Sequence, residues 1–154
     1  RSMVLWDGGC HVHGQFSIDA IVELKRMHPD AKVLVHPECP ATIQVLADEI
    51  GSTAALLNYA VKSDSKEFIV ATESGILHEM KKQCPDKTFI PAPPETTESV
   101  GCSCNECSYM RLNTLEKLYN TLKYEWPEIV VDESVAEKAL APINKMLEIS
   151  KRLK

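Results

Sequence analysis

Short apolar runs alternate with segments of helical hydrophobic spacing over the first hundred residues of the chain. The runs that predict strands are residues 2–6, 32–36, 67–71 and 88–91. The segments that predict helices begin after Ser17, at 41–49, at Gly51 and at 75–82. Strands separated by helices are typical of a parallel sheet covered on both faces. The pattern therefore predicts an α/β fold, with a three-layer αβα domain over residues 1–100.

The last third of the chain has a different pattern. Residues 92–100 are rich in Pro, Thr and Glu and lack an apolar period, so they predict a loop. An amphipathic helix is predicted after Thr114, and residues 128–131 are expected to be extended. A final helix, capped by Asp132 or Ser134, is expected to run to about residue 153.

Side chains that can bind ligands or take part in catalysis follow each predicted strand. In chain order they are Cys10, His11 and His13; His36, Glu38 and Cys39; Thr72 and Glu73; and the cysteine cluster 102–107. Ligand sites of open parallel α/β sheets lie beyond the carboxyl ends of the strands. We therefore expect Cys10, His36, Thr72 and Cys107 near one edge of the sheet.

Composition narrows the class of partner. The 154 residues are 44% apolar and 25% charged, as in ordinary soluble domains. A net charge of −5 without a basic stripe argues against a nucleic-acid partner. The apolar runs fall far short of the ~20 residues of a membrane span, and no secretory signal is apparent. An apolar run directly after Arg1 leads us to expect that the natural start lies upstream.

The six cysteines have several readings. Clustered thiols in a reducing compartment favour metal or redox chemistry over structural disulfides. Cys102-x-Cys104-x-x-Cys107 can ligate a metal, although Cys104 and Cys107 also match a redox-active C-x-x-C pair. Cys84, before Pro85, is predicted to be an ordinary buried hydrophobic residue.

Three further motifs carry candidate chemistry. Cys10-His11-Val12-His13 combines ligands that suit zinc or iron–sulfur sites. His36-Pro37-Glu38-Cys39-Pro40 fixes a histidine and a carboxylate between prolines, which suits acid–base work or binding of a polar substrate. Gly51-Ser52-Thr53 opens a helix, where the hydroxyls and free amides can hold a phosphate or carboxylate or simply cap the helix.

Taken in order, these motifs resemble the quinolinate synthase family. The matching segments are WDGGCHVH at 6–13, PDAKVLVHPECP at 29–40, TESGIL at 72–77, FIP at 89–91 and CSYMRLNTL at 107–115. The resemblance implies repeated αβα domains around a [4Fe–4S] cluster on three cysteines. It also implies condensation of iminoaspartate with dihydroxyacetone phosphate to quinolinate, the precursor of the NAD ring, in the cytoplasm or, in a plant, the plastid.

The resemblance also implies roles for single residues. Cys10 and Cys107 match two cluster ligands, and the third ligand belongs to an N-terminal part that this sequence lacks. His36 and Glu38 match the substrate-binding His-Pro-Glu motif, with Glu38 as the expected proton-transfer group. Thr53, beside Ser52, matches a hydroxyl that holds the substrate.

The resemblance also implies how the chain is divided into domains. Residues 101–154 are expected to form a cysteine loop and C-terminal helices that complete a domain begun in the missing part. With two of three ligands, this chain alone is expected not to hold a complete cluster. The alternative is a catalytically inactive αβα domain that carries thiols or a metal and acts as an interaction domain.

Overall fold

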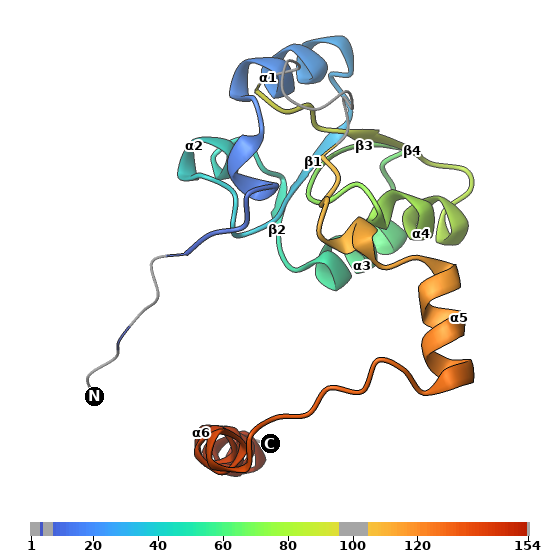
Figure 1. The fold of residues 1–154 in the computed structure, drawn as a ribbon. Helices are drawn as coiled ribbons and strands as arrows, with labels where there is room; N and C mark the ends of the chain where they lie inside the picture. The colour runs from blue at the N-terminus through green and yellow to red at the C-terminus, as the bar shows by residue number, and fades with distance from the viewer. Residues whose placement is uncertain (1–3, 5–7, 96–104, 154) are drawn as a thin grey trace. The chain divides into compact units, whose positions relative to one another are not determined.

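The structure, a computed structural model, describes residues 4, 8–95 and 105–153. It consists of two compact units, Arg1–Leu112 and Asn113–Lys154. The first unit contains a four-stranded sheet in the order β2-β1-β3-β4 (Figure 1). The predicted strand 2–6, except Val4, lies outside the described residues, as do Cys102, Cys104 and much of the predicted loop 92–100.

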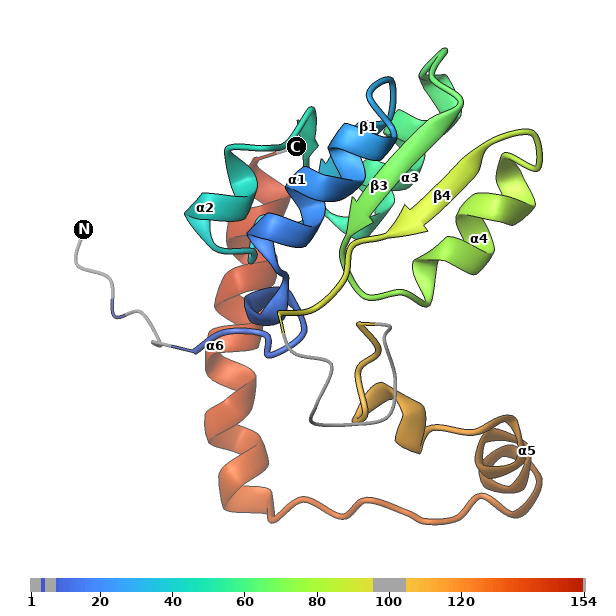
Figure 2. The same cartoon turned by 90° about the horizontal axis from the view of Figure 1, so that it is seen from above.

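All strand pairs in this sheet are parallel. The strands are β1 (Lys32–Val35), β2 (Glu49–Ile50), β3 (Glu67–Ala71) and β4 (Thr88–Pro91). The arrows of β3 and β4 point the same way in Figure 2, and Ile69 lies opposite Ile90 in their register. The strands predicted at 67–71 and 88–91 are confirmed, and the strand predicted at 32–36 ends one residue earlier.

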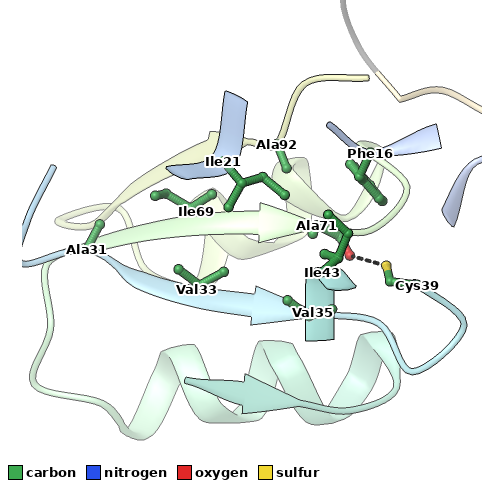
Figure 3. Packing of buried hydrophobic residues seen from close by; sticks show 10 residues of the cluster. All are labelled: Phe16, Ile21, Ala31, Val33, Val35, Cys39, Ile43, Ile69, Ala71 and Ala92. Atoms are coloured by element: carbon green, nitrogen blue, oxygen red, sulfur yellow. Dashed lines mark hydrogen bonds between the residues drawn. The ribbon is translucent and has the colours of Figure 1, made fainter. Parts of the chain in front are cut away.

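Helices cover both faces of the sheet, which confirms the predicted αβα layers. Val33 and Val35 pack on one face with Ile21 and Ile43 from α1 (Ile18–Met27) and α2 (Ala41–Gln44). Figure 3 shows this cluster. Successive strand side chains point to opposite faces. The strand residues Leu34, Phe68 and Val70 therefore pack on the other face of the sheet. They contact Leu56 of α3 (Thr53–Lys62) and Met80 of α4 (Ile76–Gln83).

Local capping chemistry explains where the helices begin. The Ser17 hydroxyl accepts the Ala20 N–H at 3.3 Å, and the Ser52 hydroxyl accepts the Ala55 N–H at 3.3 Å. These bonds satisfy amides that a helix start leaves without an intrahelical partner. The predicted starts after Ser17 and Gly51 are confirmed within two residues.

The helix predicted over 41–49 is wrong in its second half. Helix α2 ends at Gln44, and residues 49–50 form the short strand β2 beside β1. The reason is Asp48, whose carboxylate accepts the Val33 N–H and the Lys32 ammonium, each at 2.8 Å. Its own N–H donates to the Val33 carbonyl at 2.8 Å. These bonds align the segment with β1 and remove it from the helix.

The second unit contains two helices. They are α5 (Leu115–Tyr124), capped by the Thr114 hydroxyl, and α6 (Glu133–Arg152), capped by Asp132. Both were predicted, and residues 128–131 between them form no strand. Neither helix has a buried residue, although α5 carries Leu118 and Leu122 on one face. None of the described helices combines the length and apolar composition of a membrane span.

The order of the strands creates a topological switch point, the crevice position of such sheets, between the carboxyl ends of β1 and β3. The chain leaves β1 for α2 on one face of the sheet and leaves β3 for α4 on the other. Such a point, where neighbouring strands connect to opposite faces, is where open α/β sheets bind ligands. His36 follows β1 and Thr72 follows β3, so both lie at this point.

Candidate functional site

A buried histidine joins the residues that follow β1 and β3. His13, in the 3-10 turn η1 (His13–Gln15), is 6% exposed. Its Nδ1 is 2.8 Å from a Glu38 carboxylate oxygen, and its Nε2 is 3.1 Å from the Thr72 hydroxyl. In the neutral tautomer that suits these partners, Nδ1–H donates to Glu38 and Nε2 accepts the Thr72 O–H. His13 therefore ties the exits of β1 and β3 together.

His36 stacks on His13. The two rings are 4.0 Å apart between centroids and 6° from parallel. Burial lowers the pKa of His36, and the adjacent His13 lowers it further, against an opposing contribution from Glu38. His36 is therefore neutral at physiological pH. The Glu38 backbone N–H donates to His36 Nδ1 at 3.2 Å, which leaves the proton of the ring on Nε2.

Glu38 is the most accessible group of this set. Its side chain is 54% exposed although one oxygen accepts the His13 proton. The preceding Pro37 fixes the backbone, and the Glu38 amide is held by His36. The carboxylate is thus oriented from inside the protein and open to solvent from outside, as a group that exchanges protons with a bound molecule must be.

Cys10 lies beside this network. The ligand atoms of Cys10, His13 and Glu38 lie within 4.8 Å of one another, so the three could hold a metal ion. Both ring nitrogens of His13 already have hydrogen-bond partners, whereas the Cys10 thiol is half-buried and in no disulfide. Cys10 and the exposed carboxylate of Glu38 are therefore more available to a metal than His13 is.

The loop that bears Cys107 reaches the same edge of the sheet. The Cys107 N–H donates to the carboxylate of Glu73, two residues after the end of β3, at 3.4 Å. The Tyr109 ring meets the His11 ring edge-on at 5.6 Å between centroids. Since His11 neighbours Cys10, the two cysteine loops lie side by side. The structure thus brings Cys10, His36, Thr72 and the Cys107 loop to one edge, as expected.

Two other described cysteines do not belong to this site. Cys39 is 3% exposed, its thiol donates to the Ala71 carbonyl at 3.5 Å, and burial raises its pKa to about 11 (Figure 3). It is therefore a neutral thiol in the core. Cys84 caps the end of α4, before β4 begins, and so lies at the amino end of the sheet. Its predicted role as a buried hydrophobic residue is confirmed.

Ser52 and Thr53 lie beyond the carboxyl end of β2. The Ser52 hydroxyl caps α3, so of the two roles left open for this turn, capping is realised for Ser52. Thr53 is half-buried at the first position of the helix. Neither residue makes a hydrogen bond to His36 or Glu38 within the described residues.

The sequence did not distinguish His13 from His11 within the Cys10–His13 motif, and it gave Asn105 no role. His13 was one of two histidines in a loop, and only its contacts with Glu38 and Thr72 distinguish it from His11. Asn105 is 6% exposed, and its side-chain amide donates to the Ala92 carbonyl at 2.5 Å. No periodic pattern marks a loop asparagine for burial. The spacing of His13 three residues after Cys10 was the available signal.

The donor set can be tested against an iron–sulfur cluster. Such clusters are bound by cysteine thiolates. Cys10 and Cys107 are half-buried free thiols on adjacent loops, which fits this requirement. Among the described residues, the remaining cysteines, Cys39 and Cys84, are buried in the core. The described residues therefore fit two of the three expected ligands.

Comparison with known proteins agrees with the family resemblance seen in the sequence. The family model described as quinolinate synthetase A protein matches residues 1–148. The chain is 56% identical over 150 residues to the quinolinate synthase of Microcystis aeruginosa, with 97% of this chain and 46% of that protein covered. It is 55% identical over 151 residues to that of Chloroherpeton thalassium, with 98% and 46% covered. The chain spans about half the length of the curated relatives that it matches.

Proposed function

This chain belongs to the quinolinate synthetase A family, and from that premise we propose that it is part of a quinolinate synthase. The whole enzyme would condense iminoaspartate with dihydroxyacetone phosphate to quinolinate, with loss of phosphate and water, for NAD synthesis. The observation that carries the proposal is the His13–Glu38–His36 arrangement at the crevice between β1 and β3. The bacterial relatives support the cytoplasm as its compartment.

Glu38 is the proton-transfer group in this proposal. Ring formation requires removal of protons and loss of water, and a carboxylate open to the crevice suits both tasks. One oxygen is held by His13 at 2.8 Å, which leaves the other to face a bound substrate. The hydrogen bond also orients the carboxylate before substrate arrives, so less ordering is needed during the reaction.

His36 orients the substrate. Its ring is neutral, and its Nδ1 accepts from the Glu38 backbone, so Nε2–H is the donor that it can offer. A neutral donor can bind a carboxylate or carbonyl oxygen without competing for the proton that Glu38 transfers. The stacking on His13 fixes the plane of the ring and hence the direction of this donor.

The proposed cofactor is a [4Fe–4S] cluster held by Cys10, Cys107 and a third cysteine from outside this chain. When bound, it supplies an iron with an open position, which can act as a Lewis acid toward substrate oxygen atoms. Cys10 lies within reach of the same space as Glu38, so cluster and carboxylate would serve one substrate. Thr53 and Ser52, with the free amides at the start of α3, are proposed to hold a substrate phosphate or carboxylate.

Two substitutions in the full-length enzyme test the proposal. Glu38→Gln keeps the shape of the side chain but removes proton transfer, so the rate of quinolinate formation should fall roughly 10²–10⁴-fold while the cluster remains. Cys107→Ser should remove the cluster, because a hydroxyl is a poorer iron ligand than a thiolate. Turnover and visible absorbance are measured on both proteins after anaerobic reconstitution.

The outcomes separate the proposal from its alternative. Near-normal turnover in Glu38→Gln would show that Glu38 transfers no proton and only contributes to the structure of the turn. An intact cluster in Cys107→Ser would remove it from the ligand set. Absence of quinolinate formation by the reconstituted wild-type protein would instead favour an inactive thiol-bearing interaction domain.

A further inference from the structure

The loop that carries Cys107 is anchored by a buried asparagine. Asn105 donates its side-chain amide to the Ala92 carbonyl, just after β4, at 2.5 Å. Its backbone carbonyl accepts the Ser74 N–H, just after β3, at 3.0 Å. Asn105 thus bridges the carboxyl ends of two neighbouring strands, two residues before Cys107.

Glu73 adds a second anchor at Cys107 itself. One of its carboxylate oxygens accepts the Gly75 N–H at 2.8 Å, and the other accepts the Cys107 N–H at 3.4 Å. On the other side, the Cys107 carbonyl accepts the Arg111 N–H at 3.1 Å, and Arg111 pairs with Glu106 at 2.6 Å. The Cys107 backbone is therefore held on both sides of its thiol.

Burial of a polar side chain in a loop needs an explanation. Removing an amide from water is unfavourable unless it is hydrogen-bonded, and most loops leave such groups in solvent. In this loop the buried amide lies next to a thiol that stays half-buried and reaches the active edge of the sheet. The anchor thus fixes one thiol where a flexible loop would leave it free to move.

We propose that Asn105, assisted by Glu73, is a positioning residue that holds the Cys107 thiol in place to ligate iron. The inference rests on the proposed function, because it takes Cys107 as a cluster ligand. Some groups do not bind the metal but orient its ligands through hydrogen bonds. Removing such a group typically lowers metal affinity or activity 10–100-fold. The proposed function gives neither residue a contact with the substrate, so both act only through Cys107.

The test compares Asn105→Ala with Asn58→Ala in the full-length protein. Asn58 is an exposed amide on α3 and serves as the matched control. After reconstitution, release of iron to a chelator should be about 10–100-fold faster in Asn105→Ala and unchanged in Asn58→Ala. In cluster-free protein, site-resolved mass spectrometry should show faster alkylation of Cys107 by iodoacetamide, with Cys10 unchanged.

The readouts also distinguish the possible failures. If Asn105→Ala folds normally and both rates stay within twofold of the wild type, the positioning role is wrong. If Asn105→Ala does not fold, Glu73→Ala, which keeps the buried amide, must show the same two effects or the proposal fails. If Cys107→Ser loses the cluster but Asn105→Ala has no effect, the positioning role of Asn105 is wrong and the ligand role of Cys107 stands. A cluster that persists in Cys107→Ser overturns the ligand assignment and the anchor with it.

Discussion

Single residues at the crevice depend on one another through His13. Its two nitrogens join Glu38, which is exposed, to Thr72, which is 3% exposed at the end of β3. The Glu38 carboxylate can only accept, so it fixes the His13 tautomer, whereas the Thr72 hydroxyl holds the ring from within the sheet. The orientation of Glu38 therefore depends on a buried contact. We therefore expect Thr72 to influence the proposed reaction although we assign it no contact with substrate.

This coupling predicts a functional effect of Thr72→Val. Valine has nearly the shape of threonine but leaves His13 Nε2 without its partner. An unsatisfied buried acceptor is unfavourable by about 1–3 kcal/mol, so we expect the turnover number for quinolinate to fall roughly tenfold. Steady-state kinetics of the reconstituted full-length enzyme measure the effect. Thr72→Ser retains the hydroxyl and should stay within a few-fold of the wild type, and equal losses in both variants would contradict the role of the hydrogen bond.

At the scale of elements, the edge of the sheet depends on a single aspartate. Strand β2 has only two residues and pairs with the end of β1. Asp48 holds it through the Val33 backbone and the Lys32 ammonium. Burial acts to raise the pKa of Asp48, but these hydrogen bonds outweigh it and hold the pKa below its ordinary value. The ionised form therefore stabilises the fold.

The sign of this shift predicts the pH dependence of stability. A group with a lowered pKa in the folded state stabilises the protein above its unfolded pKa and loses that contribution as the pH falls through the folded value. Asp48→Asn should lower the free energy of unfolding by about 1 kcal/mol at pH 7, and the difference should shrink below about pH 4. Urea unfolding at both pH values measures it. Asp86→Asn, which affects an exposed pair with Lys66, is the control and should change little.

At the scale of the whole molecule, stability resides in the first unit. Both core clusters are formed by residues between Phe16 and Ala92. The helices α5 and α6 bury no residue of their own, and apolar side chains such as Leu118 and Leu122 are 57% and 73% exposed. That these helices complete a domain with another part of the enzyme remains a prediction.

A truncated chain tests this division. A protein that ends at Leu112 retains the sheet, both covering layers and the residues of the crevice. We expect it to unfold cooperatively, with a thermal midpoint within a few degrees of the longer chain. Circular dichroism during heating measures the midpoint. Loss of a cooperative transition on removal of residues 113–154 would show that the C-terminal helices are part of the folding unit.

The sequence by itself determined three strands of the described sheet, β1, β3 and β4, and most of the helices between them. Strands such as 67–71 and the helices capped by Ser17 and Ser52 follow from side-chain spacing and capping groups, which act over a few residues. The position of His36, Thr72 and Cys107 at one sheet edge was also predictable, because the carboxyl ends of parallel strands share an edge. These features depend on local chemistry and on one rule of topology.

Only the tertiary structure decided which of these side chains meet. Strand β2 exists because Asp48 bonds to Val33, fifteen residues earlier, and local helical spacing over 41–49 does not reveal that partner. His13 is central because Thr72, fifty-nine residues later, supplies its second hydrogen bond. The burial of Asn105 depends on the ends of two strands. Long-range hydrogen bonds of this kind leave no periodic trace in a sequence, because their partners are separated by whole elements.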